Sequence, residues 1–106
     1  MRAFTVEAEE RQLMLTTAWL FARHGQGPRA RVLLEAVVEE EPRDGVSAAM
    51  LADLLLAEHQ PAAALEAVGA FRDALKGQSF DFSTDDGVRA AVAALCRALG
   101  AEVRNA

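Results

Sequence analysis

Apolar residues recur along this chain at the spacing of α-helices. The first helix is apolar on more than one face, so it is expected to be buried on several sides. Gly25 ends this helix, and Pro28 and Pro61 stand where the second and fourth helices begin. Gly100 is expected to end the last one. The pattern predicts an all-α chain of about five helices: 5–23, 28–40, 46–58, 61–75 and 87–100.

The first four helices form two copies of one pattern. When the sequence is aligned with itself at an offset of 34 residues, Ala18 matches Ala52 and Ala30 matches Ala64. A period of about 34 residues with two helices per unit is the signature of the tetratricopeptide repeat (TPR). The same shift places Pro28 one position beyond Pro61, so the two inter-helix turns are expected to differ by one residue. We expect a single TPR-like domain over residues 1–106, built as a right-handed superhelix of antiparallel helix pairs. Repeat 1 is expected at about 11–44 and repeat 2 at about 45–78. A polar loop at 77–86 and the C-terminal helix 87–100, the start of a truncated third repeat, are expected after them.

Composition narrows the functional classes. The 106 residues are 52% hydrophobic, which is too apolar for a disordered chain. A net charge of −5 and the lack of a basic recognition helix argue against nucleic-acid binding. The single Cys96 excludes an internal disulfide and fits a reducing cytoplasm. No signal peptide is visible, and the longest apolar stretch, 46–57, is too short to enter a membrane as a spanning helix. A cytoplasmic protein is expected.

Residues that could carry chemistry are few. His24 and His59 occupy nearly equivalent turn positions, but no further ligand lies at a metal-binding spacing. Cys96 lies beside an apolar stripe, and the sequence places no general base next to it that could activate the thiol as a nucleophile. Asp85 and Asp86 lie where the first turn of a helix is predicted, and acidic residues are common there without any catalytic role. We therefore expect no enzyme activity, no metal and no cofactor.

The inner faces of the first helices of each repeat predict a partner-binding groove. Trp19 is its largest apolar residue, although a tryptophan packed in the core remains an equal alternative. The expected groove residues are Gln12, Leu15, Trp19, Ala22 and Arg23 from repeat 1 and Val46, Ala49, Asp53, Leu56 and Ala57 from repeat 2, with Ala90, Ala94 and Arg97 as approximate equivalents in the last helix.

The last helix carries an apolar stripe that no further helix follows. Its members, Val88, Val92, Leu95 and Leu99, form a possible second interface. The stripe is expected to be covered by Phe80 and Phe82, by another subunit or by a client. A homodimer or a heterodimer is therefore expected.

The run "LMLTTAWLFARHGQGPRARVLLEAVVEEEP" resembles the first repeat of small TPR chaperones of bacterial type III secretion systems, of the YscY or YscG kind. The resemblance covers about residues 11–75 and rests on the step Ala18-Trp19-Leu20 and on the second-helix residues Ala30, Arg31, Leu33, Leu34, Ala36 and Val37. It implies a non-enzymatic cytoplasmic chaperone that holds an export substrate or an apparatus component in its concave groove. The alternative is a general TPR interaction module in another assembly.

Overall fold

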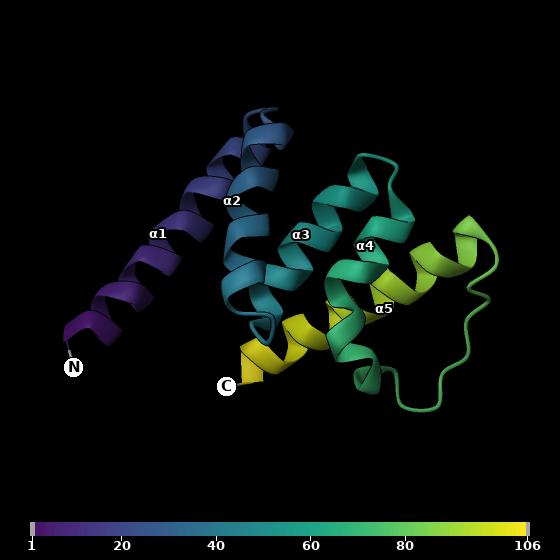
Figure 1. Cartoon of the computed structure of the whole chain (residues 1–106). Coiled ribbons are helices and arrows are strands. Elements are labelled where there is room, and N and C mark those ends of the chain that lie inside the picture. The colour runs from purple at the N-terminus through teal and green to yellow at the C-terminus, as the bar shows by residue number, and fades with distance from the viewer. Residues whose placement is uncertain (1, 106) are drawn as a thin grey trace.

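The chain folds into helices joined by tight turns and one longer loop (Figure 1). The computed structural model describes the backbone of residues 2–105 and the side chains of residues 9–99. Within those residues every regular element is helical, as the apolar pattern predicts. The elements are α1 (Arg2–Arg23), α2 (Gly27–Glu40), α3 (Gly45–Ala57), α4 (Pro61–Val68), the 3-10 helix η1 (Gly69–Leu75) and α5 (Asp85–Asn105).

The first four helices pack in sequential pairs, α1 against α2 and α3 against α4, and α2 also contacts α3. Alanines lie where the helices meet: Ala18 is 1% exposed, and Ala52, Ala30 and Ala64 are each 0% exposed. A methyl side chain allows two helix axes to approach closely, which a larger residue prevents. The burial of all four confirms that these positions face the helix contacts.

The two inter-helix turns have the same conformation. Gly25 ends α1 with a φ of 75°, and His59, which the repeat shift places on Gly25, ends α3 with a φ of 61°. In the first turn the amide of Gln26 donates a hydrogen bond to the carbonyl of Phe21 at 2.8 Å. In the second turn the amide of Gln60 donates to the carbonyl of Leu55 at 2.9 Å. The expectation that the turns differ by one residue is wrong. Their lengths are equal, because Pro28 is the second residue of α2 whereas Pro61 is the first of α4.

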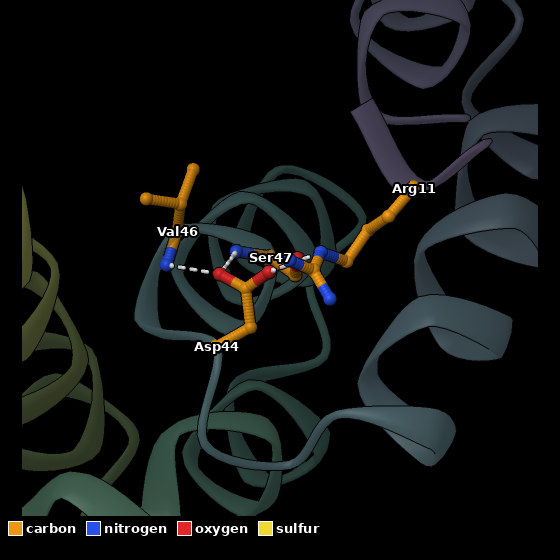
Figure 2. A network of polar contacts seen from close by, with 4 residues as sticks. All are labelled: Arg11, Asp44, Val46 and Ser47. Carbon is orange, nitrogen blue, oxygen red and sulfur yellow. Dashed lines mark hydrogen bonds and ion pairs between the residues drawn. The ribbon is translucent and has the colours of Figure 1, made fainter. Parts of the chain in front are cut away.

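Asp44, at the start of α3, contacts Arg11 of the first helix pair (Figure 2). Its Oδ1 accepts hydrogen bonds from the backbone amides of Val46 and Ser47, at 3.1 and 3.3 Å, and so caps the helix. Its Oδ2 lies 3.4 Å from Nε of Arg11 on α1. An N-cap carboxylate typically stabilises a helix by about 1 kcal/mol. The same side chain therefore starts α3 and holds it beside α1.

The fourth helix ends earlier than the sequence predicts. A continuous helix over 61–75 was expected, but α4 ends at Val68 and the chain continues as the 3-10 helix η1. Phe71 lies outside helical geometry, with φ −107° and ψ 16°. Gly69 stands at the change of helix type, and glycine is a poor helix former in a helix interior. The α-helix and the 3-10 helix have about 3.6 and 3.0 residues per turn, but over the 7 residues of η1 an apolar spacing of three to four residues fits both.

The last helix runs in the opposite direction to α3. The thiol of Cys96 donates to the carbonyl of Ala49 (Sγ···O 3.7 Å), whereas Nη1 of Arg89 donates to the carbonyl of Leu56 at 3.3 Å. Residue numbers thus rise along α3 as they fall along α5, as Figure 1 also shows. Equivalent helices of stacked repeats run in the same direction. The expectation that this helix begins a third repeat is therefore wrong, as is its end at Gly100, because α5 continues to Asn105.

The apolar stripe of α5 is buried within the chain. The helix packs across α3, α4 and η1. Each residue of the stripe is at most 8% exposed; these residues are Val88, Val92, Leu95 and Leu99. Phe80 also packs against this core, whereas Phe82 is 46% exposed. These four residues are therefore covered within the chain and do not form the second interface that the sequence suggested. The stripe of α5 is covered instead by α3, α4 and η1 of the same chain.

Candidate functional site

A groove lies between α1 and α3, with α2 beneath it. These two helices run in the same direction, as equivalent helices of two repeats do (Figure 1). Two hollows follow one another along the groove. One, of about 280 Å³, is lined by Ala18, Trp19, Ala22, Leu34, Met50, Asp53, Leu54 and Ala57. The other, of about 250 Å³, is lined by Gln12, Leu15, Thr16, Trp19, Val46 and Met50. Because Trp19 and Met50 line both hollows, we treat them as one Trp19 groove.

The indole of Trp19 is the main exposed apolar surface of this groove. The residue is 49% exposed although it lies beside the buried Ala18 and Leu15. The guanidinium carbon of Arg23 lies 4.7 Å from the centre of the indole ring, a cation–π contact. Trp19 is thus packed on one side and open on the other, which is the environment of a tryptophan at a binding surface.

The structure brings together most of the residues that the sequence predicts for the groove. Seven of them line the two hollows: Gln12, Leu15, Trp19, Ala22, Val46, Asp53 and Ala57. Arg23 reaches the groove through its contact with the Trp19 ring. The remaining two, Ala49 and Leu56, lie on the side of α3 that meets α5, where their carbonyls accept hydrogen bonds from that helix. Ala94, taken as an equivalent in the last helix, is buried at 8% exposure.

Sequence reasoning missed two residues of α3 that line the groove. Met50 lines both hollows, and Leu54 lines the larger one. The repeat shift places Met50 on Thr16, which also lines the groove but was not predicted there, so the register gave no signal for Met50. An unbranched, polarisable methionine adapts its shape to different apolar surfaces. Met50 therefore adds an adaptable wall opposite the rigid indole.

Two other hollows are larger but more polar. One, of about 330 Å³, lies between α1 and α2 and is lined by Glu10, Arg11, Met14, Val37, Glu40 and Glu41. The other, of about 380 Å³, lies against α2 and α4 and is lined by Arg31, Glu35, Leu51, Leu55, Gln60, Ala63, Glu66 and Ala67. Arg31 forms ion pairs there with Glu35 and with Glu58. These charged walls make both hollows less suited than the Trp19 groove to an apolar partner.

The candidate chemical residues lie apart from one another. Among the described side chains no group of three or more His, Cys, Asp or Glu residues lies close enough to hold a metal ion. His24 and His59 are exposed in their turns. Burial raises the pKa of the Cys96 thiol, and the negative charge of Asp53 raises it further, while Arg97 opposes them. A thiol with a raised pKa is mostly protonated at neutral pH and is a weak nucleophile.

An apolar pair of side chains lies outside the groove on α1. Leu13 and Leu20 are 67% and 45% exposed. They are two helical turns apart and so share one face, away from the buried Ala18. This pair, the Leu13–Leu20 edge, is a second apolar surface on the same helix.

Within the described residues no helix combines the length and the hydropathy that a membrane-spanning segment needs. Comparison with protein-family models, with curated proteins and with solved structures finds no match to this chain.

Proposed function

We propose that this chain is a non-enzymatic, TPR-like chaperone that binds an α-helix of a client protein in the Trp19 groove. The observation that carries the proposal is a half-exposed tryptophan lining two adjoining apolar hollows between parallel helices. Grooves of this kind receive the apolar face of an amphipathic helix, through side chains spaced one helical turn apart. No strand edge exists among the described residues, so a client cannot bind there by extending a sheet.

Burial of the Trp19 side chain contributes part of the binding energy. Burying the exposed half of the indole removes about 120 Å² of mostly apolar surface from water, which contributes about 3 kcal/mol. Met50 and Leu54 are partly buried and add apolar contacts beside it. These contacts must also offset the entropy that a client loses when its side chains become ordered.

The client class that we propose is an export substrate or apparatus component of a type III secretion system, held in the cytoplasm as a heterodimer. The resemblance of residues 11–75 supports this assignment, while the register that the two turns share supports only the TPR-like architecture. The sequence suggested a homodimer or a heterodimer because of the apolar stripe on α5, but that stripe is buried and supports neither. The groove between α1 and α3 is therefore the surface that we assign to the partner.

The proposal is tested by affinity purification from the cells that make this protein, with quantitative mass spectrometry of the bound proteins. The bait is compared with Trp19→Ala and with Val32→Ala, a control whose side chain is 66% exposed on α2. We expect one dominant secreted or secretion-associated protein, retained by the control and lost by Trp19→Ala. Equal capture by both variants, with helix content unchanged by circular dichroism, would contradict the proposal.

A second candidate, a scaffold module in a larger assembly, is favoured by the Leu13–Leu20 edge. Repeats bury such edges by stacking against a neighbouring unit. Under this alternative, replacing both leucines with glutamate abolishes assembly measured by sedimentation, and peptide binding in the Trp19 groove is unchanged. Under the chaperone proposal the same double variant still captures the client.

A further inference from the structure

Asp53 is the one acidic residue among the side chains that line the Trp19 groove. It lies in the larger hollow among apolar side chains that include Trp19 and Leu54. The ion pairs and side-chain hydrogen bonds found among residues 9–99 do not include its carboxylate. In the absence of a partner the carboxylate is exposed to water, which solvates its charge.

Binding changes the surroundings of this carboxylate. Any occupant that fills the hollow removes water from Asp53 while it covers the apolar walls. A carboxylate that loses its water without gaining a counter-charge or hydrogen bonds destabilises the complex. The same loss of water strengthens the attraction to a cation placed beside the carboxylate. A helix that brings a cation to this position is therefore expected to bind more tightly than one that brings an anion.

We propose that the partner helix carries a lysine or arginine at the edge of its apolar face, and that this cation pairs with Asp53. Asp53 is then the specificity-determining residue of the groove, while Trp19 and Met50 supply the apolar contact. This inference rests on the proposed function, because it names the charge pattern of the helix that the groove binds.

Two cations of the chain lie nearby without pairing with Asp53. The guanidinium of Arg23 is stacked on the Trp19 ring. Arg97 of α5 acts on the same Cys96 thiol as Asp53 does, and the two charges shift its pKa in opposite directions. Neither arginine lies within ion-pair distance of the Asp53 carboxylate. Arg97 is the residue that could supply the counter-charge from within the chain, so the test includes its removal.

The experiment measures the binding of three synthetic helical peptides to the whole chain by isothermal titration calorimetry. The peptides are about 18 residues long, enough for five turns, and share one leucine–alanine stripe. The positions that flank the stripe are all lysine, all glutamine or all glutamate. They are tested against the wild type, Trp19→Ala, Asp53→Asn, Asp53→Lys and Arg97→Gln. Glu40→Gln is the matched control, because it removes one negative charge from an exposed residue outside the groove.

We expect the lysine peptide to bind the wild type most tightly. Asp53→Asn weakens that peptide about three- to tenfold, whereas Glu40→Gln changes its affinity less than about twofold. Asp53→Lys reverses the preference in favour of the glutamate peptide, and Arg97→Gln leaves the order of the three peptides unchanged.

Three outcomes overturn the inference, and the measurements distinguish them. If the peptides bind, Trp19→Ala abolishes binding, and the Asp53 variants behave like Glu40→Gln, then the groove binds helices without reading charge at Asp53. A reordering of the peptides by Arg97→Gln assigns the counter-charge to α5 and also overturns it. If none of the peptides binds the wild type, the inference and the proposed function fail together.

Discussion

Ala64 tests the repeat packing more directly than any other residue. It lies on α4 and is 0% exposed, as is Ala30 at the equivalent position of α2. In Ala64→Leu three further carbon atoms enter a contact that already lacks solvent-sized space. The neighbouring helix must shift, or the new side chain must adopt an unfavourable rotamer. The change is therefore expected to destabilise the fold even though it increases hydrophobicity.

The magnitude follows from the degree of burial. Overpacking of a well-packed core typically costs about 1–3 kcal/mol. For a domain of this size the urea dependence of the unfolding free energy is about 1.5 kcal/mol per molar. The midpoint of urea unfolding should therefore fall by about 0.7–2 M in Ala64→Leu, and by a comparable amount in Ala30→Leu.

The assay is urea unfolding followed by the helical circular dichroism signal. Ala62→Leu is the matched control, since Ala62 is exposed on the same helix and the substitution is chemically identical. Exposed substitutions usually change stability by less than about 0.5 kcal/mol. Equal midpoints for Ala64→Leu and Ala62→Leu would refute the close helix contact on which the repeat register depends.

Three further predictions concern single residues elsewhere in the fold. Gly25→Ala should lower stability by about 1 kcal/mol in the same assay, because its φ is 75° although a Cβ there would meet no atom within 4 Å. Ser47→Ala should leave stability unchanged or raise it by up to about 1 kcal/mol, since its hydroxyl is buried without a hydrogen-bond partner; a clear loss would contradict this. Cys96 should react with iodoacetamide more slowly than free cysteine at neutral pH, because only the thiolate reacts and the pKa of this thiol is raised. The rate should increase as the pH rises through that pKa. A rate equal to that of free cysteine in the folded protein would contradict this.

The paired helices could be predicted from the sequence because they depend on local spacing. Ala30 and Ala64 mark positions where only a small residue fits, and the repeat shift aligns them. The same register predicts that α1 and α3 lie side by side, which was enough to place most groove residues. The boundary between α4 and η1 was not predicted, since Gly69 interrupts the helix without changing its apolar stripe.

The direction of α5 could not be predicted in this way. Val88, Val92 and Leu95 reveal which side of the helix is apolar, but an apolar stripe packs equally well in either direction. The choice depends on where the 76–84 loop places the start of α5, and the turns within and between the first two helix pairs are much shorter than this loop. For the same reason Ala49 and Leu56 were assigned to the groove although they face α5.

The central claim is that the Trp19 groove binds a helix, and the emission of Trp19 tests it most directly. Trp19 is the only tryptophan of the chain, so its fluorescence reports on this groove alone. Titration of the tryptophan-free lysine peptide into the protein should shift the emission to shorter wavelength, with a saturation curve that matches the affinity measured by calorimetry. Such a shift is expected because binding removes water from a residue that is 49% exposed. Binding detected by calorimetry without any change in the emission of Trp19 would place the partner elsewhere on the molecule and contradict the account.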